Sequence, residues 1–206
     1  MNYQALIPVK TLIRAKSRLA PYLNQQQREK LVLEMLHHVI EVLTQYKQLE
    51  QVSVVSADRQ VLQLVRSWGA RPLVEEQVGH NPALFAAAKR LTAEGAEALL
   101  TISGDLPLLS VKDIETLILK LQHADVVLAP SRDGTGTNAL LVRPPLVVPY
   151  LFGVDSLERY LRAARYRGLK ADIYCSESLG LDVDTVDDMR VFDKVKSGRS
   201  LCSLAS

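Results

Sequence analysis

Short apolar runs alternate with helical periodicity along most of the 206 residues, which predicts an α/β fold with a mostly parallel sheet between two layers of helices. Buried strands are short runs of Val, Ile and Leu, whereas amphipathic helices repeat apolar residues every three or four positions. The length fits one domain over residues 1–206. We expect the end, from about residue 198, to fray as chain termini often do.

The predicted strands are apolar runs bounded by charged or turn residues. The fourth run, "ALLTI", ends on Ser103-Gly104-Asp105, where Pro107 delays the next helix. In chain order the expected strands are 3–9, 52–57, 71–75, the run that starts at Ala98, 124–130, 139–142, 169–175 and 179–184.

The predicted helices follow from apolar spacing and from capping residues. Asp58 can cap one helix that Gly69 ends, and Pro82 lies in the first turn of another. Ser110 with Asp113, and Thr185 with Asp188, have the spacing of capping boxes. The expected helices are 24–46, 58–69, 81–95, 110–122, 155–167 and a last helix after Thr185.

Composition and charge exclude several classes of function. A net charge of +2 argues against a nucleic-acid binder, which usually carries a pronounced basic excess. Cys175 and Cys202 lie far apart without metal-ligand spacing, so we expect a reducing cytoplasm. The N-terminal segment lacks the features of a signal peptide, and no apolar run reaches the roughly 18 residues needed to span a bilayer.

Four cations follow the first predicted strand in the segment "PVKTLIRAKSRLAP": Lys10, Arg14, Lys16 and Arg18. One interpretation is a solvated helix face, as most charge runs are. The other is a phosphate-binding segment, because ligands of parallel α/β sheets bind at the carboxyl ends of the strands. The chain has neither G-x-G-x-x-G nor G-x-x-x-x-G-K-[ST], so side chains would have to hold much of the phosphate charge.

Three carboxylates follow other predicted strands. Asp105 ends the fourth strand, and Asp182 and Asp184 are two apart in the last one, where alternate residues face the same side. Neighbouring carboxylates require a positive partner, and Mg²⁺ binds carboxylate and phosphate oxygens together. The competing interpretation is an ordinary turn residue for Asp105 and an exposed turn with an N-cap for the other two.

Two segments offer small polar groups. The loop "RDGTGTN" ends in Thr137 and Asn138, and Gly153 and Ser156 lie at the start of a predicted helix, whose free amides can hold an anion. Both segments can also be read as ordinary loops. Near the third strand, Asn81 could hydrogen-bond the edge of a nucleotide base, as could Glu75 or Glu76.

Five stretches in the same order as in a known family resemble the CofC guanylyltransferases, which include the mycobacterial FbiD type. They are "IPVKTLIRAKSRLAP", "ISGDLPLL", "VVLAPSRDGTGTNALL", "FGVDSLERY" and "LGLDVDTVDDM", and they extend from residue 7 to residue 189. The resemblance implies a Rossmann-like three-layer sandwich of the glycosyltransferase-A-like nucleotidyltransferase fold. One departure is "VGHNPAL", where the family more often has Gly-Leu-Asn-Ala-Ala-Leu.

The resemblance also implies an activity. GMP would pass from GTP to the phosphate of phosphoenolpyruvate or 2-phospho-L-lactate, with release of pyrophosphate, in the biosynthesis of coenzyme F-420. Asp105, Asp182 and Asp184 would hold Mg²⁺, and Lys10, Arg14, Lys16 and Arg18 would line the GTP phosphates. The acid would be held by Thr137, Gly153 and Ser156, with Asn138 beside them, and the catalytic residues would be Lys16, Arg18 and Asp105. A homodimer is a family-level expectation.

Two other functions remain open at this point. "DVDTV" at 182–186 fits the D-x-D-x-[TV] pattern of haloacid-dehalogenase-type phosphatases, although that motif normally follows the first strand of those proteins. Release of inorganic phosphate without a nucleotide would support this alternative. A second alternative is a sensor that binds GTP or the acid without turnover.

Overall fold

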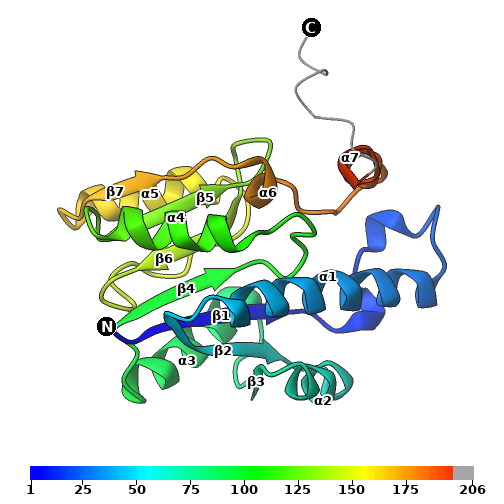
Figure 1. The fold of residues 1–206 in the computed structure, drawn as a ribbon, viewed down its shortest axis with the longest axis horizontal. Coiled ribbons are helices and arrows are strands. Elements are labelled where there is room, and N and C mark those ends of the chain that lie inside the picture. The colour runs from blue at the N-terminus through cyan, green and yellow to red at the C-terminus, as the bar shows by residue number, and fades with distance from the viewer. Residues whose placement is uncertain (197–206) are drawn as a thin grey trace, which may run out of the picture.

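The structure, a computed structural model, describes residues 1–196 apart from the side chains of Arg14 and Lys196. The predicted fraying from residue 198 and Cys202 lie outside the described residues. Seven strands form one sheet in the order β3-β2-β1-β4-β6-β5-β7 (Figure 1). Their bounds are β1 Tyr3–Val9, β2 Leu49–Ser56, β3 Arg71–Val74, β4 Ala98–Ile102, β5 Val126–Pro130, β6 Thr137–Val142 and β7 Ala171–Ile173.

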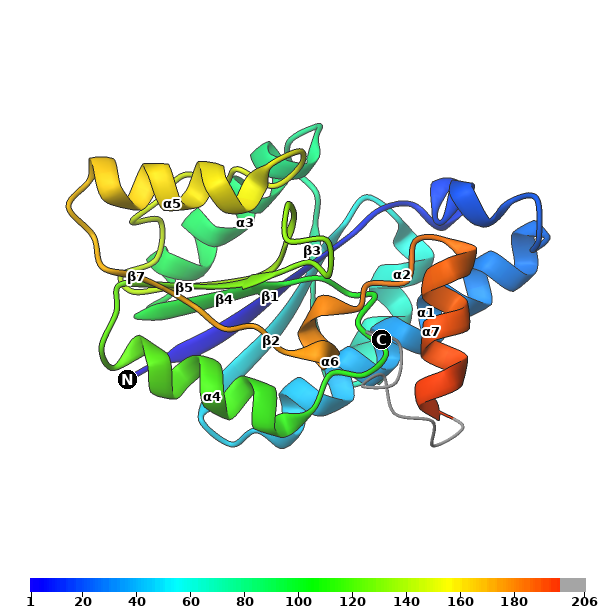
Figure 2. The same cartoon turned by 90° about the horizontal axis from the view of Figure 1, so that it is seen from above.

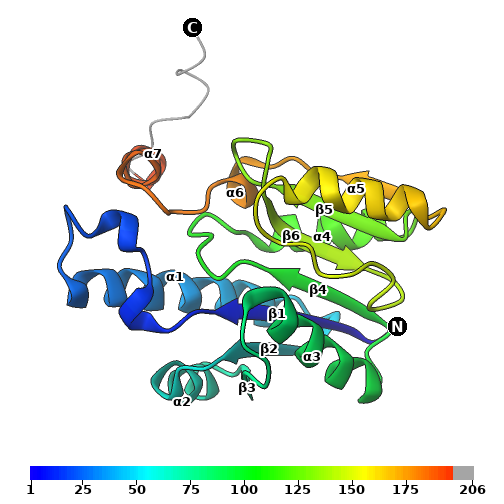
Figure 3. The same cartoon turned by 180° about the vertical axis from the view of Figure 1, so that it is seen from behind.

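The helices cover both faces of this sheet, as predicted (Figure 2). Core residues of α1, α2, α4 and α6 pack with one face, and those of α3 and α5 pack with the other face, which Figure 3 presents. The helices are α1 Gln25–Gln45, α2 Arg59–Ser67, α3 His80–Ala93, α4 Val111–Leu121, α5 Ser156–Tyr166, α6 Glu177–Gly180 and α7 Val186–Lys196, with 3₁₀ turns η1 Leu12–Arg14 and η2 Ser17–Leu19. Among residues 1–196, none of these helices has the length and apolar character needed to cross a membrane.

Strand β1 illustrates why the sequence folds in this way. Its successive residues alternate between the two faces, so that Ala5 and Ile7 pack with α1 while Leu6 packs with α3. All three are fully buried. Burial on both faces explains why the strand reads as a continuous apolar run rather than an alternating one.

The predicted sheet is mostly parallel, and the structure confirms this. The pairs β1–β2, β1–β4, β2–β3 and β5–β7 are parallel. Only β6 runs against its neighbours, pairing with β4 and β5 in antiparallel register. Its N-terminal end therefore lies beside the carboxyl ends of those two strands.

The predicted capping residues are confirmed as well. Asp58 accepts hydrogen bonds from the backbone amides of Gln60 and Val61, and Gly69 follows α2 with φ of 86°. Ser110 and Asp113 form the capping box of α4. At α7 the Thr185 amide donates to Asp188 Oδ2, and the Asp188 amide donates to Thr185 Oγ1.

The last predicted strand, 179–184, is wrong. Residues 177–180 form α6, whose N-cap Ser176 accepts a hydrogen bond from the Leu179 amide, and no strand follows up to residue 196, where the described part of the chain ends. Leu179, Leu181 and Val183 are nevertheless buried, so the alternation reports burial correctly. The segment lacks the row of backbone hydrogen bonds that would make it a strand. The backbone hydrogen bond that joins it to the end of β4 runs from the Val183 amide to the Asp105 carbonyl oxygen, at 3.3 Å.

A second difference concerns Thr137 and Asn138, which were predicted to lie in a loop. They are the first two residues of β6, and both are buried. The preceding loop, residues 131–136, is folded back on itself because Ser131 Oγ accepts a hydrogen bond from the Gly136 amide. A Cβ on Gly136 would lie 2.6 Å from Ser131 Oγ, so this close turn requires glycine.

Candidate active site

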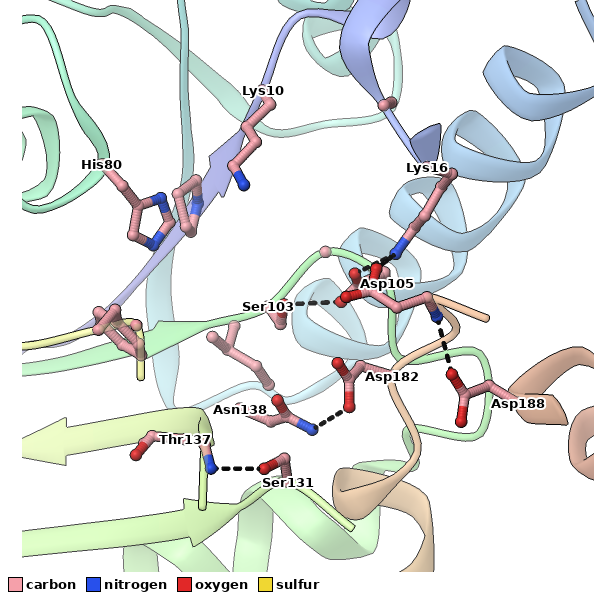
Figure 4. Close-up of a pocket in the computed structure, with 18 of the residues that line it drawn as sticks. Lys10, Lys16, His80, Ser103, Asp105, Ser131, Thr137, Asn138, Asp182 and Asp188 are labelled. Atoms are coloured by element: carbon pink, nitrogen blue, oxygen red, sulfur yellow. Dashed lines mark hydrogen bonds and ion pairs between the residues drawn. The ribbon is translucent and has the colours of Figure 1, made fainter. Parts of the chain in front are cut away.

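A cleft of about 1070 Å³ opens at the carboxyl ends of β1 and β4 and the N-terminal end of β6 (Figure 4). Its lining includes ten of the residues that were predicted to bind the metal, the GTP phosphates or the acid. They are Lys10, Lys16, Arg18, Asp105, Thr137, Asn138, Gly153, Ser156, Asp182 and Asp184. Asn81 is not among the lining residues, and the side chain of Arg14 lies outside the described part of the chain.

Lys16 is the cation at the centre of the charged part of the cleft. It lies between the turns η1 and η2 in a left-handed conformation, with φ of 51°, which costs a residue with a Cβ about 1 kcal/mol. Its side chain is only 6% exposed, and Nζ lies 2.5 Å from Asp105 Oδ2 and 2.7 Å from Asp184 Oδ1. Burial lowers the pKa of Lys16, but the two carboxylates outweigh it and hold the pKa above its usual value.

Asp105 is held at the end of β4 by a close chain turn. A Cβ on the preceding Gly104 would lie 3.2 Å from side-chain carbons of Ile7 and Leu36, so the turn packs tightly on the core. Ser103 Oγ donates to Asp105 Oδ1 at 2.6 Å, while Lys16 binds Oδ2. Burial raises the pKa of Asp105, but Lys16 and Ser103 more than offset this effect. The pKa of the carboxyl therefore lies below its usual range.

The surroundings of Asp182 shift its pKa in the opposite direction to that of Asp105. Among the described residues, the hydrogen bond given to its carboxylate comes from Asn138 Nδ2, at 3.1 Å from Oδ1. Burial raises the pKa of Asp182, and the negative charge of Asp105 raises it further against the effect of Asn138. Asp182 is therefore a partly buried carboxylate for which no cation of the described chain compensates.

Asn138 binds the chain rather than the open cleft. Its Nδ2 lies 2.9 Å from Leu179 O and 3.3 Å from Gly180 O, in addition to its contact with Asp182. These bonds fix the end of α6 against the start of β6. The predicted role in binding substrate stays a prediction, while the contacts give Asn138 a positioning role.

Small hydroxyl groups line the other side of the cleft. Ser156 Oγ donates to Thr137 Oγ1 at 3.0 Å, which leaves the Thr137 proton free to donate elsewhere. Gly153 has φ of 123°, a conformation that favours glycine. The start of α5 offers fewer free amides than expected, because Ser156 N bonds to Gly153 O and Leu157 N bonds to Thr135 O.

Lys10 and Arg18 are exposed residues of the cleft lining. His80 lines it too, with its ring 5.6 Å from that of Phe152 in an edge-to-face contact. Burial and the charge of Lys10 lower the pKa of His80. The side-chain amide of the neighbouring Asn81 donates to Phe152 O and accepts from Phe152 N, at 3.0 Å each. Asn81 therefore holds the backbone of a residue that lines the cleft.

Sequence reasoning missed two residues that shape the charged part. Ser103 directly precedes Gly104-Asp105, and a hydroxyl two residues before a carboxylate is a signal that could have been used. Asp188 was assigned only to a capping box, yet it lines the cleft and binds the amides of Asp184 and Thr185. Asp188 thereby fixes the backbone that carries Asp184.

The fit of a magnesium ion depends on these oxygen atoms. Among residues 1–196, no three His, Cys, Asp or Glu side chains converge in an arrangement that would hold a metal ion, since Lys16 lies between Asp105 and Asp184. Mg²⁺ commonly takes one or two carboxylates together with substrate phosphates and water. Asp105 and the uncompensated Asp182 fit that pattern, and the third predicted ligand, Asp184, stays a prediction because it binds Lys16, as Asp105 also does.

Known proteins share the sequence pattern of this chain over most of its length. A family model described as "Guanylyl transferase CofC like" matches residues 3–192. The phosphoenolpyruvate guanylyltransferase of Chloroflexus aggregans is 37% identical over 190 residues, covering 90% of this chain and 94% of that protein. The 2-phospho-L-lactate guanylyltransferase of Methanothermobacter thermautotrophicus is 38% identical over 190 residues, covering 92% and 83%.

A solved structure shares the fold. The 4-diphosphocytidyl-2C-methyl-D-erythritol synthase of Anaerococcus prevotii superposes with a TM-score of 0.65 at 14% identity, covering 96% of this chain and 99% of that one. This likeness confirms the predicted nucleotidyltransferase-like α/β fold. The extent of the family match and of the two sequence relatives confirms the predicted resemblance, and the chain belongs to the CofC-like guanylyl transferase family.

Proposed function

We propose that this protein transfers GMP from GTP to the phosphate of a three-carbon phosphorylated acid, releasing pyrophosphate, as a step in the biosynthesis of coenzyme F-420. The acid is phosphoenolpyruvate or 2-phospho-L-lactate, the substrates in the names of the two relatives. The observation that carries the proposal is one cleft that combines a buried lysine, the carboxylates of Asp105 and Asp182 and a pair of neutral hydroxyls.

The residue types suit a reaction between two polyanions. A phosphate monoester has its second pKa at about 6, so the attacking oxygen is already ionised at neutral pH and needs no general base. The remaining barrier is charge repulsion, together with the alignment of the acid's phosphate with the α-phosphate of GTP. A cleft with cations at one side and neutral donors at the other is suited to both tasks.

Each group of residues then has a role. Lys16, with the exposed Lys10 and Arg18, neutralises the phosphates of GTP. Asp105 and Asp182 would hold Mg²⁺, which supplies further positive charge to the phosphates. Thr137 donates its free proton to the acid, and Ser156 orients that hydroxyl. Asp184 keeps the Lys16 ammonium in place, and Asp188 fixes the backbone of Asp184.

The acceptor acid and the base are tested by one measurement. Pyrophosphate release is followed with Mg²⁺ while GTP, ATP, CTP and UTP are each combined with phosphoenolpyruvate and 2-phospho-L-lactate. We expect release with GTP and one of the two acids. Tight GTP binding without pyrophosphate release would favour the sensor, and inorganic phosphate formed from the acid without a nucleotide would favour the phosphatase.

The two relatives are nearly equally similar to this chain, so identity does not select between the acids. The comparison of the two acids at the same enzyme and GTP concentrations therefore decides the substrate. The homodimer stays a prediction, for which the molar mass in solution by light scattering is the test.

A further inference from the structure

Both carboxylate oxygens of Asp105 already have partners within the chain. Oδ2 binds Lys16 Nζ at 2.5 Å, and Oδ1 accepts the Ser103 hydroxyl at 2.6 Å. Each oxygen keeps a second lone pair for a divalent cation, but a cation bound there would lie close to the Lys16 ammonium and be repelled by its charge. The Ser103 hydroxyl can rotate and leaves no charge behind, but Lys16 carries the positive charge that a metal ion would replace.

The Lys16 ammonium also lies between two carboxylates, as a bound metal cation would. The ammonium bridges Asp105 and Asp184, which come from the end of β4 and from the segment before α7. The side chain is 6% exposed, so little water competes for these contacts. Such a cation holds its carboxylates more strongly than an exposed lysine does, because screening by solvent is weaker.

Both sides of Lys16 in the chain are anchored. The Leu12 amide donates to Asp58 Oδ2 at 3.0 Å, and Leu19 is fully buried in the core. A change at Lys16 can therefore be confined to its long side chain, whose four staggered torsions let the terminal ammonium move along the cleft once it leaves the carboxylates. The triphosphate of a nucleotide is the one ligand of the proposed reaction with enough negative charge to attract it away.

We propose that Lys16 acts as a resident counter-ion that keeps free divalent metal from Asp105 until a nucleoside triphosphate draws the ammonium away. The metal then enters with the nucleotide rather than before it. The inference rests on the proposed function only in taking a nucleoside triphosphate as the ligand. Lys16 thus has two successive partners, the carboxylates in the free protein and the phosphates in the complex.

Binding of Mn²⁺ without nucleotide tests the first half of the proposal. The free ion is counted by electron paramagnetic resonance in wild type, Lys16→Met and Lys10→Met. Lys10 is the matched control, because it lines the same cleft but forms no ion pair with a residue that the structure describes. A charge at about 4–6 Å changes the proton affinity of a carboxylate by roughly 10- to 1000-fold, so Lys16→Met should bind Mn²⁺ at least about tenfold more tightly than wild type.

Equal Mn²⁺ affinity in wild type and Lys16→Met would overturn the proposal. An equal gain in Lys10→Met would do so too, since it would reduce the effect to the net charge of the cleft. Neither of these Mn²⁺ affinities depends on whether the protein transfers GMP. A protein that lacked guanylyltransferase activity would still give the Mn²⁺ result, so the two proposals fail separately.

A measurement on the wild-type protein covers the case in which Lys16→Met does not fold. With ¹⁵N-labelled lysine, the ammonium signal of Lys16 should be visible because a buried, doubly paired ammonium exchanges protons slowly, and Lys16→Arg identifies it. We expect millimolar Mg²⁺ alone to leave the signal unchanged, and a non-hydrolysable GTP analogue with Mg²⁺ to shift it. A shift with Mg²⁺ alone at that concentration would contradict the proposal.

Discussion

Asp105 and Asp182 lie in the same cleft, yet their surroundings push their pKa values in opposite directions. Asp105 has a buried ammonium and a hydroxyl on its two oxygens, and its pKa lies below the usual range. Asp182 has one neutral amide donor, and burial with the nearby Asp105 raises its pKa. One half of the charged site is thus internally balanced and the other half is not.

The difference teaches that the fold itself satisfies only part of this site. An unbalanced, partly buried carboxylate costs stability, and such a cost is typical of a group kept for binding a ligand. The balanced half can instead form completely in the free protein. Each of the following changes alters one side of this comparison, and they are ordered by the size of the expected effect.

Asp105→Asn should have the largest effect. It removes the charge from the balanced half, so Lys16 keeps only Asp184 and the proposed metal loses a ligand. We expect kcat/KM for guanylyl transfer to fall about 100-fold, or roughly 3 kcal/mol in transition-state stabilisation. Steady-state pyrophosphate release measures it. Far-ultraviolet circular dichroism should stay unchanged, and wild-type turnover in the variant would contradict the role of Asp105.

Asn138→Ala should disturb the half that contains Asp182. Loss of the amide leaves the carbonyl of Leu179 without its side-chain donor, while Gly180 O keeps the Arg132 amide, and an unsatisfied buried group costs about 2 kcal/mol. Urea unfolding gives the difference in free energy. Thr116→Ala is the control, because its hydroxyl donates to a backbone carbonyl at an exposed position, so it should change stability by less than about 0.5 kcal/mol. Equal effects would show that Asn138 does not hold this segment.

Ser103→Ala sharpens the comparison at Asp105. The variant loses a 2.6 Å hydrogen bond to a charged acceptor, which should cost about 1–1.5 kcal/mol of the free energy of unfolding. It should also raise the pKa of Asp105, because one of the groups that favour the ionised form is gone. Ser103→Thr keeps the hydroxyl and serves as the control. If both variants unfold at the same urea concentration as wild type, the hydroxyl contributes nothing.

Asp182→Asn should stabilise the metal-free protein while lowering its activity. The amide keeps an oxygen for Asn138 but removes the uncompensated charge, and we expect a gain of about 0.5–1 kcal/mol. Asp187→Asn, at a carboxylate that is 84% exposed, should leave stability within about 0.5 kcal/mol of wild type. A lower free energy of unfolding in Asp182→Asn would mean that a group in the balanced half, around Asp105, compensates the charge of Asp182.

The pH dependence of stability should separate the two carboxylates in the same way. Asp105 has a lowered pKa, so its stabilising contribution is present above 3.8 and is lost only as the pH falls through the lower folded value. Asp182 has a raised pKa, so the cost of its charge disappears as the pH falls through that raised value. On acidification, the unfolding free energy of Asp182→Asn should therefore converge with that of wild type before that of Asp105→Asn does. The reverse order in urea titrations would contradict the assignment.

Much of the fold follows from local sequence signals. Strand β1 was predicted with its observed bounds because helices cover both of its faces and bury its side chains, and the capping boxes at α4 and α7 lie where their spacing placed them. The strand predicted at 179–184 was wrong because alternating burial does not require a strand partner. In this segment Ser176 and Asn138 hold the backbone through their side chains.

The site was predictable as a set of strand-end residues but not as a set of contacts. Asp105 and Thr137 lie at the cleft because strand ends meet at one edge of a sheet, which is a property of topology. The Lys16 contacts join residues 89 and 168 positions apart, and no local pattern encodes such a distance. For the same reason, sequence alone offered Mg²⁺ as the positive partner of the carboxylates and could not identify Lys16 as another.

The reversed direction of β6 has a consequence for how this site can vary. Residues 131–136 connect β5 to β6 as a hairpin loop that Ser131 and Gly136 close, and they deliver Thr137 to the cleft. The loop also bonds to its surroundings, through Thr135 O to the Leu157 amide and through the Arg132 amide to Gly180 O. The lysine-bearing turn after β1 reaches the same cleft on a separate part of the chain. The proposed acid-binding Thr137 and the proposed nucleotide-binding Lys16 thus come from separate parts of the chain, so exchanging the hairpin for that of a relative should change the acceptor acid more than the nucleotide.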